Sequence, residues 1–173
     1  MSFYPQPQRI LLPAKVSYIA LSLLLALVLE LMPWRAIVWL PDWVALVLAF
    51  WCIHQPRRIG IGIAWTMGLL VDAGNGSLLG QHALGYAVLA FAAIGLHRRI
   101  QWFSLWQQAA HVLLLLLASR LIMLATGMIA GGSFPGVAYF AGSLVAAALW
   151  PVVSFLLLLP QRRPERVDEN RPI

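Results

Sequence analysis

Four long apolar runs limit what this chain can fold into more than any other feature of its sequence. A helix rises about 1.5 Å per residue, so about 20 apolar residues cross the hydrocarbon core of a bilayer, which is about 30 Å thick. Two of the runs contain no Asp, Glu, Lys or Arg, and the other two contain one each. The four runs are residues 16–33, 77–96, 102–130 and 137–159.

The composition of the chain supports a membrane location for these runs. Of its 173 residues, 61% are hydrophobic and 10% are charged, whereas soluble domains carry about 25% charged residues. A soluble fold would have to hide all four runs from water at once. The sequence therefore predicts an integral membrane protein of the all-α class.

Two shorter apolar stretches, residues 41–54 and 59–74, lie between the first and second long runs. Pro56 cannot sit inside a helix, so the basic segment that joins the stretches is expected to form a tight turn. If both stretches span, the fold is a six-helix transmembrane bundle. Each is about 24 Å long as a helix, several Å short of the hydrocarbon core. The shortfall predicts a depression open to the outer side, although helix tilt or local thinning of the bilayer would also accommodate it.

The basic residues test the count of six spans, because Lys and Arg in short loops favour the cytoplasmic side. With the N-terminus in the cytoplasm, ten of the twelve fall in cytoplasmic segments, and only Arg35 and Arg120 do not. The expected organisation has both ends in the cytoplasm: a tail at 1–15, a six-span membrane domain at 16–160 and a tail at 161–173. The ten residues are Arg9, Lys15, Arg57, Arg58, Arg98, Arg99, Arg162, Arg163, Arg166 and Arg171.

Four ionisable residues are expected in the outer half of the bundle: Glu30, Asp72, His82 and Arg120. A charge inside a membrane costs about 2.5–3.5 kcal/mol at mid-depth, so each needs a partner or a role. Helix arithmetic places Arg120 at the depth of both Asp72 and Glu30, and an ion pair with either would join two helices. The four residues could instead reach the outer interface, or line a site for a ligand or a partner helix.

The chain carries none of the usual catalytic signatures. It has no His-Glu-x-x-His metal helix, no Gly-x-Ser-x-Gly elbow and no Gly-rich phosphate loop. Its single cysteine, Cys52, cannot form a thiolate cluster alone. We therefore expect no catalytic, cofactor-binding or metal-binding residues and no enzyme activity, since an intramembrane enzyme would need a pairing such as Asp72 with His82.

One segment resembles the signature of a known family. Residues 68–86 read Gly-Leu-Leu-Val-Asp-Ala-Gly-Asn-Gly-Ser-Leu-Leu-Gly-Gln-His-Ala-Leu-Gly-Tyr. This is similar to the MreD family of bacterial rod shape-determining proteins, which shows Gly-Leu-Leu-x-Asp, a glycine turn and then Leu-Gly-x-x-Ala-Leu. The segments at 41–43 and 56–62 also resemble that family's second and third helices, so the resemblance extends along essentially the whole chain.

The resemblance implies a non-catalytic subunit of the cell-elongation machinery in the bacterial cytoplasmic membrane. Its expected partner is MreC, a single-span periplasmic protein. Together they would position and regulate lateral peptidoglycan synthesis by a RodA-type glycosyltransferase and a class B penicillin-binding protein, in concert with MreB. Membrane lipid is also an expected contact, and nucleic acid is not.

The resemblance also assigns roles to residues and suggests an alternative function. Asp72, Gly76, Gly80 and Ala83 match the signature and are expected to fix the turn between the third and fourth helices and to shape a surface or pocket. The family is similar in fold to the substrate-binding subunits of energy-coupling-factor transporters. The alternative function is therefore small-molecule capture in the outer depression, where the aromatic and polar side chains would be Trp43, Asp72, Gln81 and His82.

Overall fold

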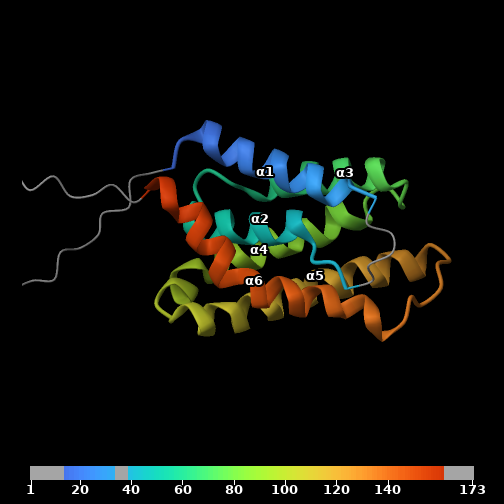
Figure 1. Ribbon diagram of the computed structural model, residues 1–173. Coiled ribbons are helices and arrows are strands. Elements are labelled where there is room, and N and C mark those ends of the chain that lie inside the picture. Colours follow the sequence, from blue (N-terminus) through green and yellow to red (C-terminus); the bar gives the residue numbers. More distant parts are fainter. Residues whose placement is uncertain (1–13, 34–38, 162–173) are drawn as a thin grey trace, which may run out of the picture.

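A computed structural model describes residues 14–33 and 39–161, and all regular structure in these residues is helical. Six α-helices alternate in direction, so that α1 begins and α6 ends at the same end of the bundle (Figure 1). The tails expected at 1–15 and 161–173 lie almost wholly outside the described residues, as does Arg35. The helices are α1 (Val16–Leu31), α2 (Trp43–His54), α3 (Ile61–Asn75), α4 (Gln81–Gln101), α5 (Leu105–Ile129) and α6 (Ala141–Leu158), with short 3-10 turns at Val137–Phe140 (η1) and Leu159–Gln161 (η2).

Local signals explain where several helices begin and end. Asp42 accepts a hydrogen bond from the Ala45 N–H and starts α2, as expected of an Asp at the N-cap position. Ser104 and Gln107 form a capping box that starts α5. Gly76, with φ of +64°, ends α3 in the left-handed conformation that glycine adopts without strain.

Among the described residues, three helical segments are long and apolar enough to cross a membrane: Gln81–Gln101, Leu105–Ile129 and Val137–Gln161. The helices α1 and α2 are apolar but shorter. At 12 residues, α2 is about 18 Å long, which is shorter than its apolar stretch predicted. The helix is shorter at both ends. Asp42 is the N-cap residue and is not itself helical, and Gln55 leaves the helical conformation just before Pro56.

The short helix α2 forms the centre of the bundle. Every residue from 44 to 53 is buried, and α1, α4, α5 and α6 pack around it. Figure 1 shows α2 between α1 and the layer formed by α5 and α6. A helix that is apolar on all sides lies either in lipid or in a protein core, and here the neighbouring helices enclose it.

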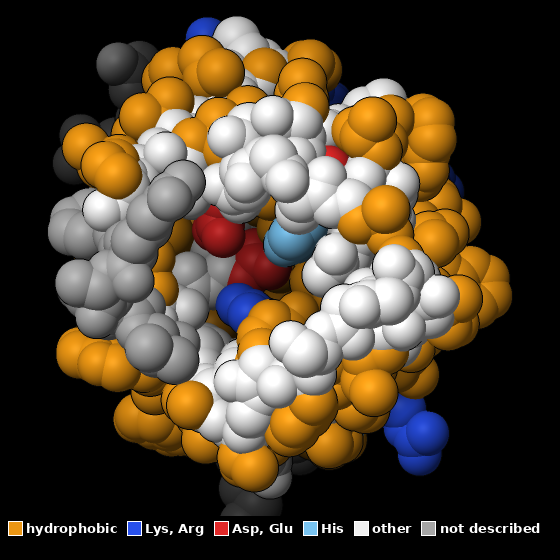
Figure 2. All heavy atoms as spheres, turned by 90° about the vertical axis from the view of Figure 1, so that its right-hand side faces the viewer, with side chains coloured by type: hydrophobic (Ala, Val, Ile, Leu, Met, Phe, Trp, Pro, Cys, Tyr) orange, Lys and Arg blue, Asp and Glu red, His pale blue; other side chains and the backbone are white. Residues whose placement is uncertain are grey.

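The helices α2, α4 and α6 all begin at one end of the bundle, and we call this end the hollow end. Figure 2 views the molecule from this end and shows acidic, basic and histidine side chains gathered in a hollow. The structure therefore has a hollow at the end of the bundle where α2 begins.

Candidate functional site

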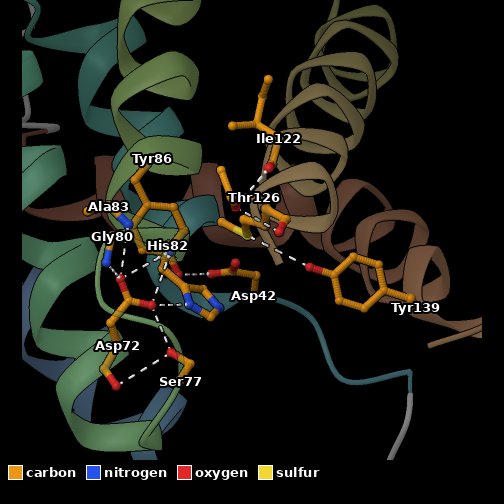
Figure 3. Close-up of polar contacts among 11 residues, drawn as sticks. Asp42, Asp72, Ser77, Gly80, His82, Ala83, Tyr86, Ile122, Thr126 and Tyr139 are labelled. Carbon is orange, nitrogen blue, oxygen red and sulfur yellow. Dashed lines mark hydrogen bonds and ion pairs between the residues drawn. The ribbon is translucent and has the colours of Figure 1, made fainter. Parts of the chain in front are cut away.

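The turn between α3 and α4 is built around one buried carboxylate, that of Asp72 (Figure 3). It accepts hydrogen bonds from the Gly80 N–H at 2.9 Å, from the His82 N–H at 3.1 Å and from the Ser77 hydroxyl at 2.8 Å. The His82 ring nitrogen Nδ1 lies 2.7 Å from the same carboxylate. Asp72, near the end of α3, therefore caps the start of α4.

This arrangement follows from the needs of a helix N-terminus. The first N–H groups of a helix have no partner within the helix, and its positive end favours a negative charge. Gly80 begins α4 with φ of +101°, a left-handed conformation that favours glycine. Asp72, Gly80 and Ala83 thus meet in one turn, while Gly76 ends the helix that carries Asp72.

Two helices approach unusually closely just below this turn. A Cβ atom added to Gly68 on α3 would lie 2.3 Å from the Cα of Ala83 on α4. Backbone cannot move aside as a flexible side chain can, so the contact requires glycine at position 68. Small residues at such a crossing let two membrane helices pack backbone to backbone.

A pair of carboxylates, those of Asp42 and Glu30, lies at the start of α2. Asp42 caps the helix and also accepts a hydrogen bond at 2.8 Å from the hydroxyl of Tyr86, a fully buried residue of α4. Glu30, from α1, accepts the Trp43 N–H at 2.8 Å. Three helices are therefore joined by hydrogen bonds at the positive end of α2.

Arg120, on α5, lines the hollow end together with residues of η1 and α6. Its guanidinium stands over the Tyr139 ring, 4.8 Å from the ring centre, within cation–π range. Arg120 also lines a small cavity with Asp42, Ser119 and Ser143. Neither serine hydroxyl has a hydrogen-bond partner among the described residues.

Arg120 forms no ion pair with Asp72 or with Glu30 among the described residues. Within residues 14–33 and 39–161 the ion pair is that of His82 with Asp72, and Arg120 forms none. For Asp72 the physical reason is the arrangement of the helices: α4 packs against both α3 and α5, so it stands between Asp72 and Arg120. Counting residues along each helix predicts that the charged groups lie at the same end of the bundle. It does not predict the direction in which each side chain points.

Sequence reasoning missed the wider role of Asp42. It predicted an apolar helix over residues 41–54 but not the hydrogen bond that Tyr86 on α4 donates to Asp42. Nothing in the sequence marks Tyr86 as the partner, since 44 positions separate the two residues. In the described part of the chain, no group of three or more His, Cys, Asp or Glu side chains could hold a metal ion.

The fold and this site define a class: a helical membrane protein in which buried carboxylates cap helices at one end of the bundle. The family model described as rod shape-determining protein MreD matches residues 13–159, and the chain belongs to this family. The rod shape-determining protein MreD of Haemophilus influenzae is 32% identical over 141 residues, which cover 80% of this chain and 86% of that protein. No solved structure matches the chain.

Proposed function

We propose that this chain is a non-catalytic, multi-pass subunit of the rod-shape machinery in the bacterial cytoplasmic membrane. In this proposal it binds the single-span protein MreC, and the pair positions and regulates lateral peptidoglycan synthesis by a RodA-type glycosyltransferase and a class B penicillin-binding protein, in concert with MreB. Membership of the rod shape-determining family supports the assignment to this machinery. The assignment of MreC and of the synthase as partners rests on the family resemblance.

The observation that carries the proposal is the rigid turn between α3 and α4. Asp72 holds the backbone on both sides of it, yet the turn presents Leu79 with 70% of its surface exposed. Leu78 beside it is 48% exposed. A fixed turn that displays large apolar side chains suits recognition by another protein better than catalysis, since its carboxylate is already occupied by hydrogen bonds.

The test is affinity capture of the tagged chain from its native membrane in mild detergent, with partners identified by mass spectrometry. The wild-type chain is expected to recover a single-span periplasmic protein together with synthase components. The variant Leu79→Ser should lose that partner while its own abundance stays unchanged. The matched control is Leu105→Ser, at the opposite end of the bundle, where 47% of the side chain is exposed. Equal partner recovery by both variants would reject the turn as the docking site.

We also propose six membrane spans over residues 16–160, with both tails in the cytoplasm and the hollow end on the periplasmic side. The described basic residues outside the bundle interior lie at the end opposite the hollow, and such a bias marks the cytoplasmic side. The variant Leu79→Cys should react in whole cells with a maleimide that cannot cross membranes. The natural Cys52 is buried and provides an unreactive background. If Leu79→Cys is labelled only after cell lysis, the hollow end faces the cytoplasm and the proposed topology is wrong.

The hollow supports a second candidate function, capture of a small molecule as in energy-coupling-factor transporters. Asp72 contributes little to such a site, because its carboxylate is fully buried and caps α4. Recovery of ATPase subunits without wall-synthesis proteins in the capture experiment would favour this alternative.

A further inference from the structure

Hydrogen-bond donors without partners gather in one place, the small cavity beside Arg120. Ser119 of α5 and Ser143 of α6 line this cavity together with Arg120. The two serines are 1% and 2% exposed. Three buried side-chain atoms of the described residues lack a hydrogen-bond partner, and two of them are the hydroxyl oxygens of these serines. Because a buried hydroxyl without a partner is costly, both hydroxyls point to a ligand that forms hydrogen bonds.

The guanidinium of Arg120 lies where a positive charge is unfavourable. One of its nitrogens is 3.3 Å from the position of a Cβ atom added to Gly142, the second residue of α6. The N-terminal end of a helix carries a positive partial charge, and Phe140 at the N-cap position of α6 provides no capping hydrogen bond. Among the described residues Arg120 has a cation–π contact with Tyr139 but no ion pair. Two positive groups therefore lie side by side, in a position where an anion would stabilise both.

Asp42 is the acidic residue that lines the same cavity, but its carboxylate is already engaged. It accepts hydrogen bonds at 2.8 Å from the Ala45 N–H and from the Tyr86 hydroxyl, and it forms no ion pair with Arg120. A guanidinium can only donate hydrogen bonds, and each serine hydroxyl can donate one. The other polar groups of the cavity therefore favour a ligand that has several acceptor atoms and a negative charge.

We propose that Arg120, Ser119 and Ser143 bind a phosphate group that enters from the hollow. The oxygens of a phosphate group point in different directions, so they can accept hydrogen bonds from α5 and α6 at once. A guanidinium also matches the geometry of phosphate with two parallel hydrogen bonds. The proposal does not depend on the identity of the protein partner, and it uses none of the residues in the turn between α3 and α4.

Entry of the phosphate group requires a movement of the Arg120 side chain. In the structure the cavity is too narrow for a water molecule, so water does not satisfy the serine hydroxyls. Figure 2 shows a basic side chain in the wall of the hollow, and Arg120 is the basic residue described at this end of the bundle. A phosphate group in the hollow therefore meets the guanidinium first. The long arginine side chain has several rotatable bonds, so it can turn with the bound phosphate and open the way to the serines.

Two serines of α6 allow a matched test of the site. Ser143 lines the cavity, whereas Ser154, another buried serine whose hydroxyl has no partner among the described residues, does not. The purified full-length chain, in an uncharged detergent without phosphate, is dialysed to equilibrium against radiolabelled inorganic phosphate. In a second arm it is equilibrated with micelles that contain phosphatidylglycerol, and bound lipid is counted by native mass spectrometry. We expect Ser143→Ala to bind about tenfold more weakly than the wild type and Ser154→Ala to bind equally well. Equal binding by the two variants would overturn the site.

The role of the charge is tested by Arg120→Gln, after circular dichroism has shown that the variant keeps its helices. The substitution leaves a polar side chain but removes the guanidinium, and we expect measurable binding to be lost. Binding as tight as that of the wild type would overturn the role of Arg120.

The two arms distinguish the sources of the phosphate group. Binding of inorganic phosphate would identify a free anion as the ligand. Binding of phosphatidylglycerol, but not of diacylglycerol with the same acyl chains, would identify a lipid headgroup. If neither compound binds, the proposal is wrong, and loss of the protein partner in Arg120→Gln would then show that an acidic side chain of the partner occupies this place.

Discussion

Replacing Asp72 by alanine tests whether its carboxylate holds α3 and α4 together. The substitution removes the acceptor for the backbone N–H groups of Gly80 and His82 and for the Ser77 hydroxyl. Leaving a buried donor without a partner costs about 1–3 kcal/mol. Because both backbone donors are only partly buried, water can satisfy part of this demand. We expect Asp72→Ala to lower the free energy of unfolding by about 2–4 kcal/mol.

Two further substitutions separate the backbone cap from the contact with the histidine ring. Asp72→Asn keeps an oxygen acceptor but loses the charge, so we expect a smaller loss than with alanine. His82→Ala removes the ring contact with Asp72 at 2.7 Å and the edge contact with the Tyr86 ring, and leaves the backbone bonds in place, so we expect a loss of about 1 kcal/mol.

The assay is unfolding by sodium dodecyl sulfate in mixed micelles, followed by the helical circular dichroism signal. Partner capture is measured on the same variants, so that a loss of the fold is not mistaken for a loss of the interface. An Asp72→Ala variant within about 0.5 kcal/mol of the wild type would refute the capping role, since that is the scatter of neutral surface changes. A His82→Ala variant as unstable as Asp72→Ala would show that the ring contact, and not the cap, carries the energy.

Two other predictions concern contacts between helices and use the same unfolding assay. Gly68→Ala should destabilise the bundle by about 1–3 kcal/mol, because its Cβ would meet the backbone of Ala83. The control is Gly95→Ala, which has nothing within 4 Å of the added carbon and should be neutral or more stable by about 0.5–1 kcal/mol. Equal effects of the two substitutions on stability would contradict the close packing of α3 against α4. Tyr86→Phe removes the hydroxyl that donates to buried Asp42 and should cost about 1–3 kcal/mol; a stability equal to the wild type would mean that this bond does not help to hold α2 to α4.

The structure gives the rod-shape assignment a mechanical interpretation. Carboxylates from α1, α3 and the start of α2 are occupied as hydrogen-bond acceptors at helix N-termini. Such bonds are strong in a protein interior, and they fix the helix ends against one another. Helix ends that are fixed in this way fit the proposed role, in which the chain binds other proteins of the rod-shape machinery.

Local sequence determined the six helices and several of their ends. Apolar runs of sufficient length must become helices in a membrane, because every backbone polar group there needs a partner within the segment. Pro56 and the glycine turn after Asp72 set helix limits that the structure confirms. The signature around Asp72 also indicated the family, because its residues match the motif of that family position by position.

The packing of the helices decided what the sequence could not. Depth along a helix follows from counting residues, but the direction of a side chain depends on how each helix is rotated against its neighbours. Asp72 therefore pairs with His82 rather than with Arg120, and Asp42 finds Tyr86 on a helix far along the chain. The enclosure of short α2 and the cavity beside Arg120 likewise arise only when the neighbouring helices are placed around α2. Apart from the pair of Asp72 and His82, these contacts join residues that are distant in sequence, so local pattern carries no record of them.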